Sequence, residues 1–127
     1  MTLQRVFLAV FLLSTVLVGV LSVSEPILKG EVEALRAFKS LIRNDPLGVL
    51  DDWTDANHHC NWSGIACDSS FNHVISISLV DKQLEGEISP FLGNLSNLQV
   101  LDLTLNSFTG NIPHQLGLCS QLTELTL

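Results

Sequence analysis

Apolar residues recur at a fixed interval through the second half of the chain. When the sequence is shifted by 24 positions (74 to 98 to 122), leucines, isoleucines and valines fall in shared columns. The full columns are Val74, Leu98 and Leu122; Ile77, Leu101 and Leu125; and Leu79, Leu103 and Leu127. Their LxxLxL spacing alternates apolar and polar positions, which predicts a short strand whose leucines point into a core.

The rest of each period is matched as well. The remaining columns are Leu84 and Phe108, Gly86 and Gly110, Ile88 and Ile112, Leu92 and Leu116, and Gly93 and Gly117. A period of this length, with the LxxLxL motif followed by an asparagine such as Asn106, is typical of leucine-rich repeats. We therefore predict an α/β solenoid in which each repeat packs only on its neighbours and the strands line a concave face. Solenoids of this kind bind other molecules, so we expect recognition as the function and no catalytic residues.

The polar positions between the leucines are expected to face outwards on the concave surface. The candidate ligand-binding residues there are Ser78, Asp102, Thr104 and Glu124. They are small or acidic and are held on rigid strands. The alternative is a solvated surface without a ligand, which is the favoured interpretation for the first repeats of an array. Lys82 occupies the asparagine column and has no acceptor in its side chain, a departure typical of terminal repeats.

A segment of different character, residues 25–73, precedes the repeats. Its pattern predicts a helix from Glu31 to Ile42 that Asn44-Asp45-Pro46 ends, because the residue before a proline is disfavoured in helical geometry. Further on, the string CNWSGIACD places two cysteines around a tryptophan. We expect the helix and a disulfide-bonded hairpin to form a cap, since the first strand of a solenoid would otherwise leave its edge and its apolar face in water.

The first residues have the three-part organisation of a secretory signal peptide. Arg5 precedes an apolar run from Val6 to Leu21, and the small residues Ser22-Val23-Ser24 follow it. The run is shorter than the roughly 20 residues that span a bilayer, so cleavage after Ser24 is favoured over a retained signal anchor. The expected divisions are a signal peptide at 1–24, a cap at 25–73 and repeats at 74–127, two of them complete and the third truncated.

The acidic charge balance excludes one class of partner. Without Arg5 the chain has five basic and thirteen acidic residues, a net charge of 5 − 13 = −8 over residues 25–127. Binding to a phosphate backbone needs a basic surface, so we expect no nucleic acid partner. Since the chain shows no second long apolar run, we expect membrane attachment only through a transmembrane helix absent from these residues.

In an exported chain, Cys60 and Cys67 can form a disulfide, because that environment is oxidising. Cys119 aligns with Leu95 and is expected to pack in the core as a small apolar residue. A metal site is the alternative for a group of neighbouring residues, namely His58, His59, Cys60, Cys67 and His73. The cysteine spacing does not match the usual spacing of zinc ligands, so we predict neither a metal nor any other cofactor.

Two sequons offer N-glycosylation sites in an exported protein. Asn94-Leu95-Ser96 falls on the connection between repeats, where a glycan meets no obstacle. Asn61-Trp62-Ser63 adjoins a cysteine and a tryptophan that a cap would bury, so modification of Asn61 stays open. Asn94 is therefore the favoured site and Asn61 the second candidate, with unmodified surface asparagines as the alternative.

Two stretches of the sequence resemble a known family. LQVLDLTLNSFTGNIPHQLG resembles the plant-specific class of leucine-rich repeat, whose second half reads LxGxIPxxLG. EVEALRAFKSLIRNDPLGVLDDW and CNWSGIACD resemble the N-terminal cap of plant receptor kinases and receptor-like proteins, and LVDKQLEGEISP is similar to the flagellin-sensing group among them. The resemblance implies an extracellular ectodomain of many repeats that binds a peptide or protein ligand and a co-receptor. A membrane-spanning helix and a cytoplasmic serine/threonine kinase are implied to follow it.

The sequence departs from that family plan because it stops at Leu127, in the strand of its third repeat, without a kinase motif. In the family the ligand generally lies on later repeats, so its binding residues are not carried over to this chain. The expected location is the extracellular face of the plasma membrane, or the apoplast for a secreted form. Two other hypotheses stay open: a secreted inhibitor of an extracellular enzyme, similar to polygalacturonase inhibitors, and a truncated product without a function.

Overall fold

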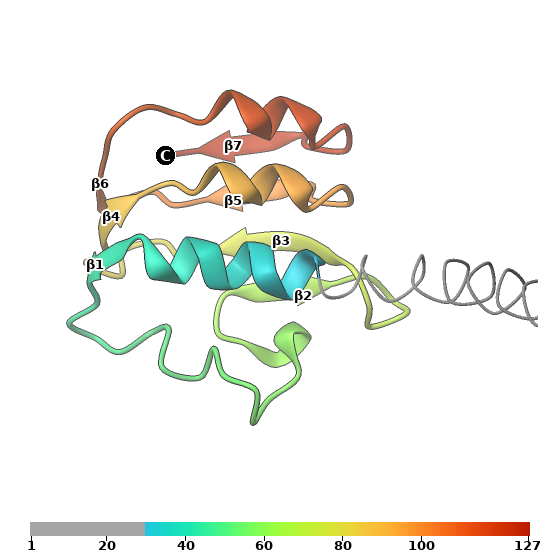
Figure 1. The fold of residues 1–127 in the computed structure, drawn as a ribbon, viewed down its shortest axis with the longest axis horizontal. Coiled ribbons are helices and arrows are strands. Elements are labelled where there is room, and N and C mark those ends of the chain that lie inside the picture. The colour runs from blue at the N-terminus through green and yellow to red at the C-terminus, as the bar shows by residue number, and fades with distance from the viewer. Residues whose placement is uncertain (1–29) are drawn as a thin grey trace, which may run out of the picture.

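This computed structural model describes residues 30–127. Short strands in this range form two sheets (Figure 1). The longer sheet has the order β2-β3-β5-β7, and the shorter sheet has the order β1-β4-β6. The longer sheet consists of β2 (Ile65–Cys67), β3 (Val74–Ser78), β5 (Val100–Asp102) and β7 (Glu124–Thr126). The shorter sheet consists of β1 (Ile42–Asn44), β4 (Glu85–Glu87) and β6 (Ser107–Thr109). The signal peptide predicted at 1–24 lies outside the described residues.

The strand register of the longer sheet reproduces the period of the sequence. Ile77 pairs with Leu101, and Leu101 pairs with Leu125, in parallel ladders. Each step is 24 positions (77 to 101 to 125), so every repeat supplies one strand to the sheet. The strands β3, β5 and β7 lie one above the other in Figure 1 in that order. The predicted solenoid is therefore confirmed.

Each repeat returns to the longer sheet through a short 3-10 helix. These helices are η2 (Pro90–Asn94) and η3 (His114–Leu118). Ser89 Oγ accepts a hydrogen bond from the Phe91 amide at 3.2 Å and caps η2, and Pro90 suits the first helical position because no donor is needed there. Among the described residues, the α-helical part of the fold is thus confined to the cap.

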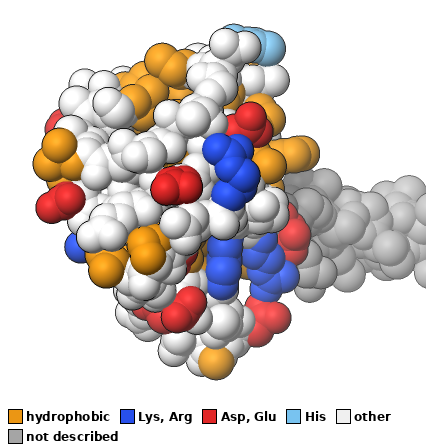
Figure 2. Space-filling view, turned by 90° about the vertical axis from the view of Figure 1, so that its left-hand side faces the viewer, with side chains coloured by type: hydrophobic (Ala, Val, Ile, Leu, Met, Phe, Trp, Pro, Cys, Tyr) orange, Lys and Arg blue, Asp and Glu red, His pale blue; other side chains and the backbone are white. Residues whose placement is uncertain are grey.

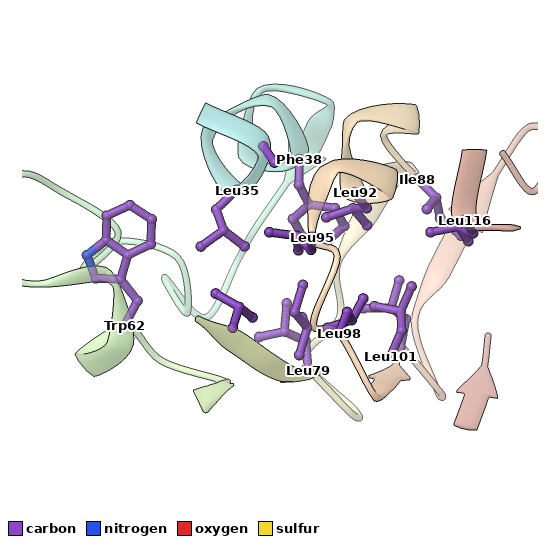
Figure 3. Close-up of a cluster of buried hydrophobic side chains, with 14 of the residues drawn as sticks. Leu35, Phe38, Trp62, Leu79, Ile88, Leu92, Leu95, Leu98, Leu101 and Leu116 are labelled. Carbon is purple, nitrogen blue, oxygen red and sulfur yellow. The ribbon is translucent and has the colours of Figure 1, made fainter. Parts of the chain in front are cut away.

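The core lies between the strands of the longer sheet and the helical segments that face them (Figure 3). Residues from neighbouring repeats stack within it, and Leu92, Leu95 and Leu98 are fully buried. In one leucine column, Leu101 lies between two neighbouring strands and is 0% exposed, whereas Leu125 lies in the last strand of the sheet and is 42% exposed. Each repeat is therefore stabilised by the repeat that stacks on it.

The cap helix spans residues 30–40 and buries Ala34, Leu35 and Phe38 in the core. The prediction that this helix extends to Ile42 is wrong. Ile42 begins β1, which pairs antiparallel with β4, and the Leu41 carbonyl accepts a hydrogen bond from the Glu87 amide at 3.2 Å. The chain leaves helical geometry because the edge of β4 offers unpaired backbone groups, a long-range interaction that helical periodicity does not reveal.

A hairpin covers the edge of the first repeat strand. β2 pairs antiparallel with β3, and Cys60 and Cys67 form a disulfide with Cα atoms 5.5 Å apart. Trp53 and Trp62 are buried and stack with their ring centroids 5.4 Å apart. The cap thus protects both the strand edge and the apolar face of the first repeat, as the sequence pattern predicts.

One asparagine joins two successive repeats. Asn106 Oδ1 accepts hydrogen bonds from the backbone amides of Lys82 at 3.1 Å and Leu84 at 3.0 Å. Asn106 Nδ2 donates to the carbonyls of Leu79 at 2.6 Å and Leu103 at 2.9 Å. Asn106 therefore holds the backbone turn of the preceding repeat, the turn that contains Lys82.

Positively and negatively charged side chains lie together at the end of the molecule that contains the shorter sheet. Figure 2 shows lysine and arginine side chains beside aspartate and glutamate side chains on that face, with hydrophobic side chains scattered among them. Arg43 there donates to Thr109 Oγ1 at 3.0 Å and so ties β1 to β6. No helix within residues 30–127 has the length and apolar character to cross a membrane.

Candidate recognition surface

The longer sheet brings the candidate ligand-binding residues onto one face. Ser78 on β3 is in register with Asp102 on β5, so these two side chains are neighbours on the same side of the sheet. Thr104 follows β5, and Glu124 begins β7. Ser78 and Glu124 are exposed, while Asp102 and Thr104 are partly exposed. The structure therefore groups Ser78, Asp102 and Thr104, with Glu124 on the next strand.

Thr104 holds the Asp102 carboxylate in place. Asp102 Oδ1 accepts hydrogen bonds from the Thr104 hydroxyl and from the Thr104 amide, the latter at 3.1 Å. These donors lower the pKa of Asp102, and the Thr104 hydroxyl is the main cause. The result is a fixed negative charge on the concave surface. Because the hydroxyl proton is committed to Asp102, a ligand at this position meets acceptors rather than donors.

Both asparagines of the predicted glycosylation sites are exposed. Asn94 is the last residue of η2. Asn61 is the last residue of the short 3-10 helix η1 (His59–Asn61) and lies between buried Cys60 and buried Trp62. Both side chains are therefore open to solvent, as attachment of a glycan requires.

One group of metal-ligating side chains lies close together within residues 30–127, and it consists of His58, His59 and Cys60. The Cys60 sulfur is bonded to Cys67, so it offers no thiolate to a metal. Cys119 is free and 5% exposed, and burial raises the pKa of its thiol. Its position in the core agrees with its alignment with Leu95.

A buried polar cluster at the junction of the cap and the first repeat was not predicted from the sequence. Glu31 is 2% exposed, although a position in the first turn of a helix favours a solvated carboxylate. Glu31 Oε2 accepts a hydrogen bond from the Val74 amide at 3.2 Å, and its carboxylate lies 3.4 Å from His73 Nδ1 and 3.8 Å from His59 Nε2. No local pattern signals this cluster, because 43 positions separate Glu31 from Val74.

Comparison with known proteins matches both the cap and the repeats. Residues 28–68 match the leucine rich repeat N-terminal domain family. The LRR receptor-like serine/threonine-protein kinase EFR of Arabidopsis thaliana is 41% identical over 88 residues, which cover 68% of this chain and 8% of EFR.

Solved structures of plant receptors share the fold. The ectodomain of GASSHO1/SCHENGEN3 from Arabidopsis thaliana, in complex with CASPARIAN STRIP INTEGRITY FACTOR 2, has a TM-score of 0.68 at 31% identity and covers 77% of this chain and 12% of that one. The Arabidopsis receptor kinase HAESA, in complex with the peptide hormone IDA and the co-receptor SERK1, has a TM-score of 0.63 at 31% identity, covering 72% of this chain and 15% of that one.

The chain is a leucine-rich repeat protein. Its cap matches the leucine rich repeat N-terminal domain family at residues 28–68, and its cap and repeats are similar to those of plant receptor-like kinase ectodomains. The matched part spans only 8% of EFR and 12% of another Arabidopsis receptor-like kinase.

Proposed function

We propose that this chain forms the N-terminal end of a cell-surface recognition ectodomain, on which an extracellular peptide or protein ligand and a co-receptor assemble. The main support is the combination of a family-matched cap at residues 28–68 with strands paired at 24-position intervals (77 to 101 to 125). A cap that protects the first strand, followed by repeats in strict register, is how a solenoid presents a rigid concave surface.

The relatives support a ligand of peptide type. GASSHO1/SCHENGEN3 was solved with CASPARIAN STRIP INTEGRITY FACTOR 2, and HAESA with the peptide hormone IDA and the co-receptor SERK1. We infer the same kind of assembly here. The fixed Asp102 carboxylate would favour a cationic or hydrogen-bond-donating group on whatever approaches β5, since complementary charge guides partner choice.

In this proposal the residues of this chain bind and position, and they perform no chemistry. Export through the secretory pathway would place the concave surface outside the cell, and kinase activity would belong to a separate domain. The relatives favour this assignment over a secreted enzyme inhibitor, because EFR is a receptor-like kinase and the matched solved structures are receptor ectodomains.

A domain exchange tests the proposal. Residues 30–127 of this chain would replace the matched segment of EFR in plant cells, with the unaltered receptor as the positive control. We expect the exchanged receptor to reach the cell surface and to signal in response to the ligand of EFR, because these repeats serve as a capped scaffold. A matched control carries Gly93→Ala, whose added Cβ would lie 2.3 Å from the Gln115 carbonyl oxygen of the next repeat and should reduce the amount at the surface. Retention of the exchanged receptor inside the cell would contradict the proposal.

A further inference from the structure

Three titratable side chains meet where the cap helix, η1 and the start of β3 come together. Glu31 and His59 are 2% and 6% exposed, and the side chain of His73 is 33% exposed. Besides its contact with Glu31, His59 Nε2 lies 3.3 Å from the Asn72 carbonyl oxygen. The Glu31 carboxylate therefore connects the helix to η1 and, through the Val74 amide, to the first repeat strand.

Other charged and titratable groups surround this cluster. The His58 ring stacks on the His59 ring with centroids 4.5 Å apart, and Asp68 Oδ1 accepts a hydrogen bond from the His73 amide at 3.3 Å. The cluster is accessible to protons from two sides. His73 is partly exposed, and His59 lines an open cavity of about 530 Å³ whose other charged or titratable lining residues are Glu33, Arg36, Asp55 and His58.

We propose that Glu31 and His59 form a proton-sensitive junction, in which mildly acidic solution weakens the attachment of the cap to the first repeat. His59 is buried against another imidazole and donates through Nε2 to the Asn72 carbonyl. A neutral ring satisfies this arrangement. A second proton on His59 would place a positive charge beside His58 on a ring that is only 6% exposed, and the cost of burying that charge would favour opening of the junction.

The pKa directions fit this geometry. Burial lowers the pKa of His59, and the neighbouring His58 adds to the effect. The stabilising contribution of neutral His59 is therefore complete above its ordinary pKa of 6.5 and is lost as the pH falls from there towards the lowered folded-state value.

Glu31 acts in the opposite direction. Burial raises the pKa of Glu31 above its ordinary value of 4.5, so the folded state takes up a proton on this carboxyl before the unfolded state does. Stability is regained as the pH falls through that raised pKa towards 4.5. Glu31 thus moderates the weakening that His59 causes, and substitutions of the two residues should change the pH profile in opposite senses.

The test is the hydrogen-exchange protection of the Val74 amide in the full chain, measured from about pH 8 to about pH 5, the range in which imidazoles titrate. The Leu98 amide is the internal reference, because Leu98 occupies the same repeat column and donates to the Leu95 carbonyl at 3.0 Å. We expect the ratio of Val74 to Leu98 protection to fall below pH 6.5, by up to about tenfold per pH unit, which is the limit for one proton.

Three substitutions test which side chain causes the pH dependence of Val74 protection. His59→Gln keeps a donor for Asn72 but cannot titrate, and it should abolish the acid loss of Val74 protection. Glu31→Gln keeps an acceptor for the Val74 amide and should make the loss steeper. His114→Gln, at an exposed position in η3, should leave the wild-type profile unchanged. Identical profiles for the wild type and His59→Gln would overturn the proposal.

A second measurement on the wild type does not depend on the folding of any variant. The His59 imidazole is titrated by NMR in parallel with Val74 exchange. We expect a His59 midpoint below 6.5, with the loss of Val74 protection confined to the pH range between 6.5 and that midpoint. Protonation of His59 without any change at Val74 would overturn the proposal.

Discussion

Asn106 Nδ2 lies 2.6 Å from the Leu79 carbonyl oxygen, and this hydrogen bond crosses from one repeat to the strand end of the repeat before it. The amide also accepts from the backbone of the preceding turn through Oδ1. Asparagine is required because the position needs a donor and an acceptor on one short side chain. The asparagine column is therefore a connection between repeats as well as a local turn signal.

Replacement of Asn106 by aspartate should destabilise the fold. The carboxylate keeps an acceptor for the Lys82 and Leu84 amides but cannot donate. The carbonyls that accept from Asn106 Nδ2, those of Leu79, Leu103 and Thr104, therefore lose this donor and face a negative charge. We expect a loss of about 1–3 kcal/mol in the free energy of unfolding, measured by urea denaturation. Asn111→Asp, at an exposed position, is the control and should cost less than about 0.5 kcal/mol. Equal losses of unfolding free energy in the two variants would contradict the conclusion that Asn106 connects successive repeats.

The two glycines of one repeat column should respond differently to alanine. A Cβ on Gly93 would lie 2.3 Å from the Gln115 carbonyl oxygen of the next repeat, whereas a Cβ on Gly117 has no atom within 4 Å. Gly93→Ala should therefore force the repeats apart and cost about 1–3 kcal/mol. Gly117→Ala should be neutral or slightly stabilising, since alanine lowers the entropy of the unfolded chain. A comparison of the two melting temperatures checks this, and a Gly117→Ala protein less stable than Gly93→Ala would contradict it.

Alanine substitutions of two leucines in the same column should show how much the stability contributed by each leucine depends on burial by a neighbouring repeat. Leu101 is fully buried and Leu125 is 42% exposed, although the two are equivalent in sequence. Leu101→Ala should cost about 2–5 kcal/mol because it leaves a cavity, while Leu125→Ala should cost about 1 kcal/mol or less. The measurement is chemical denaturation of both variants. Equal losses would show that the core does not follow the stacking of repeats.

Glycosylation is predicted at Asn94 and is open at Asn61, both of which are exposed. When the chain is secreted from plant cells, removal of N-glycans should increase its electrophoretic mobility. Asn94→Gln should abolish that shift in whole or in part, and the double variant with Asn61→Gln should abolish it entirely. Ser120→Ala, at an exposed residue outside any sequon, serves as the control. An unchanged shift in Asn94→Gln would leave Asn61 as the modified site.

The strands and their core residues could be predicted because residues 24 positions apart in the sequence are paired in neighbouring strands. Once Ile77 and Leu101 are known to be equivalent, their pairing across neighbouring strands follows. The buried Cys119 could be predicted in the same way from its alignment with Leu95. The cap tryptophans followed from their size and from the need to cover the first strand.

The cap contacts that depend on distant residues could not be predicted. Ile42 fits the apolar face of a helix, but it forms a strand because its backbone pairs with the edge of β4. Glu31 fits the helix dipole, yet the packing of η1 and β3 around it encloses its carboxylate. In both cases the contact that determines the local structure is made with a residue more than 40 positions away in the sequence, so a periodic pattern does not predict it.

The size and location of the native protein provide the most direct test of its assignment to a receptor ectodomain. An antibody raised against residues 54–58, which are exposed in the cap, would be used to probe membrane and extracellular fractions of the organism that produces the protein. We expect a glycosylated, membrane-associated band several times larger than 13.9 kDa, because the matched region spans only 8% of a relative such as EFR. A single soluble apoplastic product near 13.9 kDa would contradict the receptor assignment.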